Sequence, residues 1–323
     1  MIRIAPGKSP VRRLRRFMYN VMRYYEMYGF NALVQAGRGR LMKFIYPVAY
    51  RGAILRFGAR NLFLRSKPLR LQVADVCWLM MPKGAVAFEF WTGGYFERNE
   101  LSFVLRYLRK GMTFVDVGSN VGLFTLAAAK RLEQLGGGMV YAFEPFEWSF
   151  GVLRENVRLN NLSNVSLHCT ALGNYTGEAV LWINAPWKDG LNTLGKPSHP
   201  DSQVIGHVTV PITTIDAFVK AENIPKVDLM KVDVEGGELL VFKGSEDLLR
   251  RPDAPVLLYG SQGFLTAGFN YHPVETMWFL QDCGYQFWVL DPTGKASPRK
   301  PEHGYEGMIV AAKPSHSTVI SIL

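Results

Sequence analysis

The chain has 323 residues, 48% of them hydrophobic, which is enough to bury one large core or a core with an appendage. Its formal net charge is +10, and no apolar run approaches the roughly 20 residues that a membrane-spanning helix needs. Three widely spaced cysteines (Cys77, Cys169 and Cys283) form neither a disulfide framework nor a zinc-binding pattern. Since the N-terminus also lacks the apolar core and cleavage site of a secretory signal, we expect a cytoplasmic protein.

The excess positive charge lies in residues 1–70, which hold sixteen of the 37 lysines and arginines and one acid, Glu26. Bases and aromatic residues are interleaved there, and we expect short helices. Three interpretations stay open: a helical extension with a solvated basic face, a peripheral anchor on anionic membrane, and nucleic-acid binding. Nucleic acid is disfavoured because no recognised module accompanies the charge. We assign 1–70 to this basic helical extension, 71–313 to the main domain and 314–323 to a tail.

Residues 71–76 are predicted to form a strand, and 101–109 a helix with one apolar face. Glu97 and Glu100 lie beside the start of this helix, on the approach to a glycine-rich turn. They could hold the amino group of a ligand, or they could simply stabilise the helix start through its dipole.

The most informative stretch is 113–122, Thr-Phe-Val-Asp-Val-Gly-Ser-Asn-Val-Gly. A short β-branched run with an acid, Asp116, precedes a small-residue turn, and residues 121–132 have helical spacing. Strand, glycine turn and helix are typical of the first βαβ unit of an open parallel sheet. Ligands of such sheets bind beyond the carboxyl ends of the strands.

A second predicted strand, 138–144, ends in Glu144, whose carboxylate is suited to accept hydrogen bonds from a ribose diol. The glycine turn lacks the G-x-G-x-x-G spacing that wraps a pyrophosphate. Asp116 would repel a phosphate but attract a cationic amino acid. The two acids therefore favour a nucleoside that carries a positive amino group, which describes S-adenosylmethionine.

The following elements are predicted to be a helix over 146–162, a third strand over 165–172, a turn at 173–177 into a strand over 179–183, a short strand over 208–211, and a helix that starts near Thr214. The turn predicts a β-hairpin between the strands that flank it. Residues 184–206, rich in Pro, Gly, Asn and Ser, are predicted to be a mobile loop over the site.

Residues 227–238 form the second informative block. An apolar strand with Lys231 ends in Asp233 and Glu235, and two glycines then lead into a helix predicted over 238–250. Crowded carboxylates at a strand end can have perturbed protonation, which suits proton abstraction. The alternative is a solvated strand end without a catalytic role.

The remaining elements are predicted to be a strand over 254–259, a helix over 272–282 and strands over 286–290 and 307–312. His272 stands at the helix start after a loop rich in Gly and Asn. Two interpretations are open, a polar group of the site and a capping or surface histidine.

Together these blocks closely resemble the FkbM family of S-adenosylmethionine-dependent methyltransferases, from about Gly93 to about Asp291. The segments that carry the resemblance are Asp116–Gly122, Phe143–Pro145, Asn156–Asn160, Ala171–Gly173, Thr214–Asp216 and Lys231–Glu238. The resemblance implies an α/β class I methyltransferase (Rossmann-like) fold. Its mostly parallel seven-stranded sheet has helices on both faces, and its last strand is inserted antiparallel.

By this resemblance Asp116, Gly118, Asn120 and Gly122 would surround the methionine part of the cofactor, Glu144 would hold the ribose and Ala171 would lie near the adenine. The expected cofactor-binding residues also include Ser119, Pro145 and Asp233, together with Glu97 and Glu100 from their place before the glycine turn. Asp233 would lie where the methyl donor faces its acceptor. The family usually has an acid after the fifth strand, where this chain reads Tyr259-Gly260. Glu235 or His272 could substitute for that acid, or Tyr259 could line an altered pocket.

We therefore expect an O-methyltransferase that acts on a hydroxyl of a sugar, glycan or secondary metabolite. Asp233 or Glu235 is the expected general base, with Lys231 and His272 as polar contributors. The alternative is a non-catalytic cofactor-binding or scaffolding protein, since the acceptor site departs from the family pattern. Clustered carboxylates suit magnesium, but no separate ligand set accompanies them, and no metal is expected. A nucleotide-dependent oxidoreductase would need the missing glycine spacing.

Overall fold

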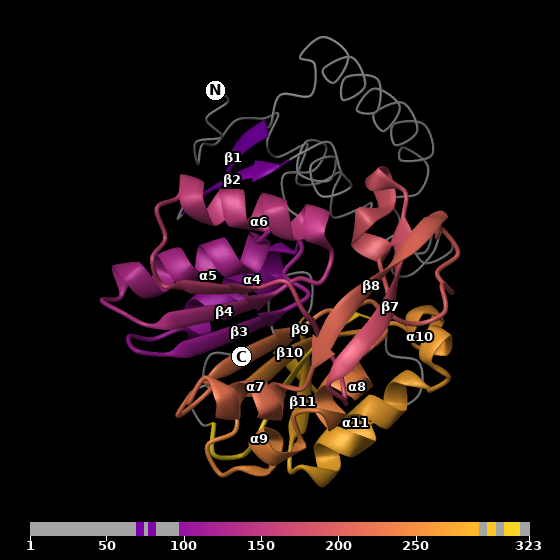
Figure 1. Ribbon diagram of the computed structural model, residues 1–323. Coiled ribbons are helices and arrows are strands. Elements are labelled where there is room, and N and C mark those ends of the chain that lie inside the picture. Colours follow the sequence, from indigo (N-terminus) through magenta and orange to yellow (C-terminus); the bar gives the residue numbers. More distant parts are fainter. Residues whose placement is uncertain (1–68, 74–76, 82–96, 291–295, 302–306, 317–323) are drawn as a thin grey trace, which may run out of the picture. The chain divides into compact units, whose positions relative to one another are not determined.

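The computed structural model describes residues 69–73, 77–81, 97–290, 296–301 and 307–316 (Figure 1). The helices predicted within 1–70 lie outside the described residues, apart from the last two positions, and so does most of the predicted tail. Two short strands, β1 (Leu69–Val73) and β2 (Cys77–Met81), form a sheet of their own. The described residues from Asn99 onward belong to one compact unit. No helix in the described part of the chain is long and apolar enough to cross a membrane.

The main sheet of this unit has eight strands in the order β12-β11-β13-β10-β9-β3-β4-β5. They are β3 (Thr113–Val117), β4 (Met139–Phe143), β5 (Val165–His168), β9 (Leu229–Val232), β10 (Val256–Ser261), β11 (Gln286–Leu290), β12 (Ala296–Arg299) and β13 (Gly307–Ala312). Five neighbouring strands, β5, β4, β3, β9 and β10, are parallel to one another. Strand β13 lies between β10 and β11 and is antiparallel to both. This confirms the class I methyltransferase fold with its inserted last strand. The edge strand β12 was not predicted.

Helices cover both faces of the sheet (Figure 1). They are α4 (Arg98–Tyr107), α5 (Leu123–Gln134), α6 (Glu147–Leu159), α7 (Ile215–Ala221), α8 (Glu238–Lys243), α9 (Glu246–Arg250), α10 (Gly263–Thr266) and α11 (Pro273–Asp282), with 3₁₀ turns η1 (Pro186–Leu191) and η2 (Ala267–Phe269). One face packs against α7, α8, α9 and α11, which share one hydrophobic cluster with Val117, Val232 and Tyr259 of the strands. Figure 1 shows α4, α5 and α6 together on the other face. Asp116 and Lys231 face that side because successive side chains of a strand alternate.

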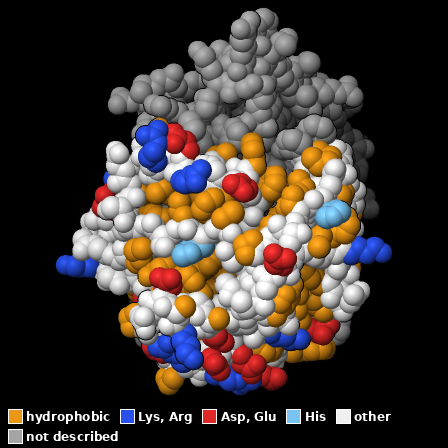
Figure 2. All heavy atoms as spheres, viewed as in Figure 1, with side chains coloured by type: hydrophobic (Ala, Val, Ile, Leu, Met, Phe, Trp, Pro, Cys, Tyr) orange, Lys and Arg blue, Asp and Glu red, His pale blue; other side chains and the backbone are white. Residues whose placement is uncertain are grey.

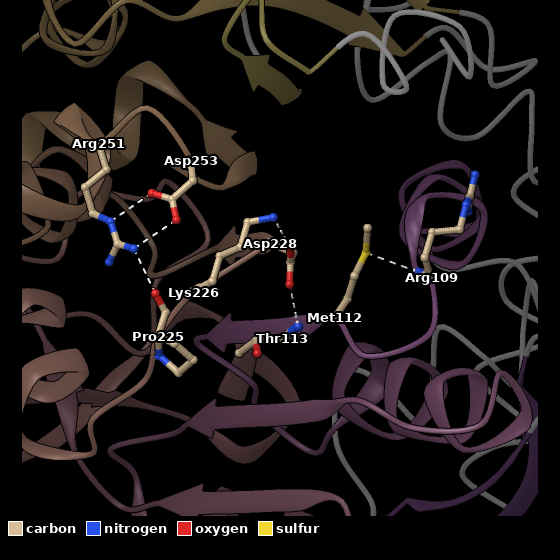
Figure 3. A network of polar contacts seen from close by, with 8 residues as sticks. All are labelled: Arg109, Met112, Thr113, Pro225, Lys226, Asp228, Arg251 and Asp253. Atoms are coloured by element: carbon tan, nitrogen blue, oxygen red, sulfur yellow. Dashed lines mark hydrogen bonds and ion pairs between the residues drawn. The ribbon is translucent and has the colours of Figure 1, made fainter.

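A polar network fixes the two central strands at their amino ends (Figure 3). The Asp228 carboxylate accepts the Thr113 N–H at 2.8 Å and pairs with Lys226 at 2.7 Å, while the Asp228 N–H donates to the Thr113 carbonyl at 3.0 Å. Arg251 pairs with Asp253 at 2.9 Å on the same side. This network sets the register of β3 against β9, so that their carboxyl ends meet at the opposite edge of the sheet.

A second, three-stranded sheet has the order β6-β8-β7, and here the sequence prediction was wrong. The expected single strand over 165–172 is two strands, β5 in the main sheet and β6 (Ala171–Leu172) in the small one. The expected hairpin partner of β7 (Gly177–Asn184) is also different, because β7 pairs antiparallel with β8 (Val204–Thr213), whereas β6 pairs parallel with β8. The small sheet has its own hydrophobic cluster, which includes Leu181 and Ile212. Packing of that cluster decides the pairing, and local periodicity does not show it.

The hairpin of β7 and β8 exposes several large hydrophobic side chains, and Figure 2 shows hydrophobic groups on this side of the molecule. Ile205 is 66% exposed, and Val180, Val204 and Val208 are each at least 40% exposed. The segment 184–206, predicted to be a mobile loop over the site, contains η1 and a bridge in which Thr193 pairs with Trp182.

The helix predicted over 238–250 is divided into α8 and α9 at Gly244. A Cβ at Gly244 would collide with the carbonyl oxygen of Gly173, so the chain needs glycine where the two segments cross. The Gly244 carbonyl accepts the Asp216 N–H at 3.1 Å, a bond made outside the helix. This crossing explains why one apolar pattern forms two short helices.

Candidate active site

The carboxyl ends of the parallel strands bring the predicted site acids to one edge of the main sheet. The turns after β3, β4 and β9 are joined by backbone hydrogen bonds. The N–H groups of Gly118 and Ser119 donate to the Phe143 carbonyl at 3.0 and 2.9 Å, and the Asp233 N–H donates to the Val117 carbonyl at 3.0 Å. The glycine turn therefore lies directly between the end of β4 and the end of β9.

Two glycines of this turn have left-handed backbone conformations and close neighbours. Gly118 has φ +79°, and a Cβ there would collide with the carbonyl oxygen of Asp233. Gly122 has φ +98°, and a Cβ would lie 2.6 Å from Leu153 of α6. Both backbone conformations are ones that L-residues rarely adopt. The Ser119 hydroxyl closes the turn by donating to the Asp116 carbonyl at 2.7 Å.

Asp116 is the second-last residue of β3, and its side chain is buried, with 1% of the residue exposed. The Thr125 hydroxyl of α5 donates to its Oδ2 at 2.6 Å. Burial raises the pKa of the Asp116 carboxyl, and the neighbouring Lys231 opposes that increase. Within the described part of the chain, Asp116 Oδ1 is buried and has no hydrogen-bond partner. This oxygen can accept a hydrogen bond from a ligand.

Glu144 lies at the rim with its carboxylate oriented by two backbone N–H groups. Its Oε2 accepts from Asn120 at 3.0 Å, and its Oε1 accepts from Phe146 across Pro145 at 2.9 Å. Asn120 has φ +48°, and its Oδ1 is a second buried oxygen with no hydrogen-bond partner among the described residues. Both oxygens of the Glu144 carboxylate are thus held in place by backbone N–H groups. Its contact with a ribose diol remains a prediction.

The other predicted cofactor residues have different surroundings. Ala171 is buried in the hydrophobic cluster of the small sheet. Glu100 is 5% exposed in the first turn of α4, and Glu97 precedes that helix with φ +45°. Their cofactor contacts, like those of Ser119 and Pro145, remain predictions.

Lys231 and Asp233 form an ion pair at the end of β9. Lys231 Nζ donates to Asp233 Oδ2 at 3.1 Å and lies 4.8 Å from the ring centre of Phe124. The Lys231 side chain is 4% exposed, whereas that of Asp233 is 29% exposed. The buried ammonium thus compensates the charge of a carboxylate that still reaches solvent, and β3 and β9 place Lys231 beside Asp116.

Glu238, the first residue of α8, was part of the matched motif but was not predicted as a site residue. It is 3% exposed, and its Oε1 accepts the N–H groups of Val234 at 3.1 Å and Gly236 at 3.3 Å. Burial raises the pKa of Glu238 to about 7, and the nearby charge of Asp233 contributes. Its place in the sequence could have indicated this role, because an acid that follows two glycines at a helix start can accept hydrogen bonds from the preceding turn.

Gly260 of β10 lies beside Asp233 on the same face of the sheet. A Cβ at Gly260 would lie 3.2 Å from Asp233 Oδ1 and 3.9 Å from the sulfur of Met308. Tyr259, one of the alternatives considered for lining an altered pocket, points to the other face, where it is completely buried and its ring centre lies 5.3 Å from that of Phe242. The alternation of side chains along β10 accounts for this difference.

His272 is exposed and caps α11. Its Nδ1 accepts the Val274 N–H at 3.3 Å, and the Glu275 carboxylate accepts the His272 N–H at 2.7 Å. This arrangement is the capping interpretation of the sequence. A catalytic role of His272 remains a prediction, as does one for the half-buried Glu235, whose backbone has φ +55°. Within the described ranges, no three His, Cys, Asp or Glu residues could hold a metal ion.

Comparison with known proteins gives matches to methyltransferases. The chain is 30% identical over 148 residues to Methyltransferase 1 of Beauveria bassiana, an alignment that covers 41% of this chain and 58% of that protein. It is 25% identical over 154 residues to the hexuronic acid methyltransferase AglP of Haloferax volcanii, which covers 48% of this chain and 58% of the relative. The chain thus spans about three fifths of the length of these curated relatives.

Among solved structures, the methyltransferase FkbM from Methylobacillus flagellatus KT matches with a TM-score of 0.42 and 16% identity, over 70% of this chain and 52% of that one. The family model described as the Methyltransferase FkbM domain matches residues 116–287, more than half of the chain. This range contains the glycine turn, Glu144 and the Asp233 turn. The chain therefore belongs to the FkbM family of methyltransferases.

Proposed function

We propose that the chain is an S-adenosylmethionine-dependent O-methyltransferase that acts on a hydroxyl of a sugar, glycan or secondary metabolite. The observation that supports it most directly is the position of Asp233. Its carboxylate is 29% exposed and paired with the buried Lys231, and its backbone carbonyl lies against Gly118 of the glycine turn. A base and a cofactor-binding turn in contact are what alkyl transfer to a hydroxyl requires.

The cofactor fits the polar groups of this edge. Asp116 Oδ1 and Asn120 Oδ1, both buried and without a hydrogen-bond partner among the described residues, would receive the amino group of its methionine part. Glu144 would accept from the ribose hydroxyls. Gly118 and Gly122 let the backbone approach closely, and the remaining predicted cofactor residues would complete the shell. Bound there, the cofactor supplies an electrophilic methyl group carried on a sulfonium.

The chain's own contribution to the reaction is orientation and removal of a proton. Asp233 Oδ2 is engaged by Lys231, and Oδ1 points toward Gly260, where no side chain covers it from β10. The acceptor hydroxyl would donate its proton to Oδ1. Lys231 keeps the carboxylate in one orientation, which lowers the entropic cost of aligning base and acceptor. Glu235 is the alternative base on the same turn.

The acceptor class is supported by one relative, whose name states that it methylates a hexuronic acid. A hydroxyl on an acidic sugar is therefore the first acceptor to test. Contact of the basic residues 1–70 with an anionic membrane remains part of the proposal, and it would suit a lipid-linked sugar.

A second candidate is a cofactor-binding protein without methyl transfer. Gly260 supports it, because family members usually have an acid after the fifth strand and this chain has no side chain there. Both candidates would bind the cofactor equally well, so only a measurement of methyl transfer distinguishes this protein from the enzyme.

Calorimetric titration with S-adenosylhomocysteine, with NADH as the control ligand, tests the cofactor first. Saturable micromolar binding of the former alone is expected. Methyl transfer to a panel of glycosides that includes the p-nitrophenyl glycoside of glucuronic acid then separates the two candidates. Binding without transfer to any acceptor of a broad panel would favour the non-catalytic protein, and no binding would refute both.

A further inference from the structure

The segment of residues 193–198, here called the strap, connects the small sheet to the turns at the site edge. Backbone bonds in both directions, at 2.9 and 3.2 Å, join Thr193 to Trp182 of β7. The Lys196 N–H donates to the Gly268 carbonyl at 2.9 Å, and the Ser198 hydroxyl contacts the Leu265 carbonyl at 3.5 Å. The strap is thus an ordered connection between β7 and the residues that follow β10.

The side chain of Thr193 makes the contact closest to the proposed chemistry. Thr193 is 6% exposed, and its hydroxyl donates to the Glu235 carbonyl at 2.9 Å, 42 residues away in the sequence. The same oxygen accepts the Gly195 N–H at 3.2 Å. One hydroxyl therefore joins the strap to the turn that carries both candidate bases, Asp233 and Glu235.

That turn has a conformation that needs support. Glu235 has φ +55° and Gly236 has φ +102°, two successive residues in the left-handed region. A non-glycine residue in that region costs on the order of 1 kcal/mol and persists when its surroundings hold it. Gly236 also packs closely against the backbone of Leu265, because a Cβ at Gly236 would lie 2.5 Å from the Leu265 carbonyl oxygen.

Three side chains from different elements hold the peptide groups of the turn. The Tyr271 hydroxyl donates to the Gly236 carbonyl at 2.6 Å, and Glu238 accepts the Val234 and Gly236 N–H groups. Thr193 supplies the third contact. Glu238 and Tyr271 act from α8 and from the loop before α11, whereas Thr193 acts from the strap between β7 and β8.

We propose that Thr193 is a positioning residue that holds the Asp233–Glu235 turn in its working conformation through the Glu235 carbonyl. The part of this inference that concerns turnover rests on the proposed methyl transfer, whereas the part that concerns the turn does not. Thr193 itself contacts neither Asp233 nor the glycine turn in any bond described above. Its loss should therefore affect turnover more than cofactor affinity.

The first test is hydrogen–deuterium exchange at the Val234 and Gly236 amides. Thr193→Val keeps the shape of the side chain but removes the hydroxyl, and Thr193→Ser restores it. Thr209→Val, an exposed strand threonine of β8, is the matched control. We expect exchange at the two amides to rise about tenfold in Thr193→Val, the factor that corresponds to one buried hydrogen bond. Thr193→Ser and the control should stay within about twofold of the wild type.

The second test measures methyl transfer from S-adenosylmethionine to the glucuronic acid p-nitrophenyl glycoside. Thr193→Val should lower kcat with a smaller change in KM, and Thr193→Ser should restore it, while S-adenosylhomocysteine affinity stays unchanged in all variants. Exchange in Thr193→Val equal to that of the control would overturn the proposal, and so would faster exchange with wild-type kcat. If the wild type binds S-adenosylhomocysteine but transfers no methyl group, the proposed function is at fault, and the exchange test alone decides the role of Thr193.

Discussion

The wild-type protein is expected to lose stability as the pH rises, because the buried carboxyl of Glu238 must ionise. Replacing Glu238 by glutamine is expected to abolish that loss. Glu238 is 3% exposed, and its carboxylate oxygen accepts two backbone N–H groups of the preceding turn. Glutamine has nearly the same shape and retains an oxygen for those bonds. The substitution therefore changes the charge at this position with little change in the contacts.

The magnitude follows from the pKa of Glu238, which burial raises from 4.5 to about 7 in the folded state. Because the folded protein holds this proton more tightly than the unfolded chain, the stabilisation is complete below pH 4.5. It is lost as the pH rises through 7. A difference of this size corresponds to about 3 kcal/mol in the free energy of unfolding. The Glu238→Gln variant should therefore match the wild type near pH 4.5 and exceed its stability by up to about 3 kcal/mol at pH 8.

Urea unfolding of both proteins between pH 4.5 and 8 measures this difference directly. Other groups, including the buried Asp116, also contribute to the pH dependence, but they are common to both proteins and cancel in the comparison. Glu178→Gln, at an exposed position of β7, is the control and should give a curve parallel to the wild type. If the Glu238→Gln curve is also parallel, the carboxyl titrates alike in the folded and unfolded states, and the reasoning from burial is wrong.

Four further outcomes are expected. Asp233→Asn should abolish turnover and leave S-adenosylhomocysteine affinity within a few-fold; wild-type rates would exclude Asp233 as the base. Gly118→Ala should remove detectable S-adenosylhomocysteine binding, since a Cβ collides with the Asp233 carbonyl, and wild-type affinity in calorimetry would contradict this. Asp228→Ala should lower the free energy of unfolding by about 1–3 kcal/mol in urea, because the Thr113 N–H loses its acceptor; an unchanged midpoint would count against it. Deleting residues 1–60 should reduce binding to anionic liposomes at low salt, and unchanged binding would refute the membrane contact.

Local sequence patterns predicted most of the main sheet. The glycine turn after β3 and the acids that end β4 and β9 placed these strands in parallel, and the resemblance supplied the antiparallel last strand. The patterns did not show that 165–172 divides between two sheets, or that β7 pairs with β8. Those pairings depend on which apolar side chains pack together across the small sheet, and strand periodicity is the same for either partner.

The site was predicted only in part, for a similar reason. Asp116, Glu144 and Asp233 do lie along one edge, because the ends of neighbouring parallel strands must meet there. The contacts of Thr193 and Tyr271 with the Asp233 turn were not foreseen. They join residues 42 and 35 positions apart in the sequence through backbone carbonyls, which leave no residue-type signature. Glu238 was visible as a motif residue, but its raised pKa depends on burial that only the packing shows.

The position of β13 has a consequence for synthesis on the ribosome. This strand, residues 307–312, separates β10 from β11 and is hydrogen-bonded to both, although both precede it in the chain. A nascent chain that has emerged only to the end of β11 therefore has an open edge on β10, a strand that is buried in the finished core at every position except Gly260. Open edges of apolar strands pair readily with other chains. The core can therefore be completed only after β13 has been synthesised. A chain interrupted before Gly307 should be prone to aggregate rather than to fold as a smaller domain.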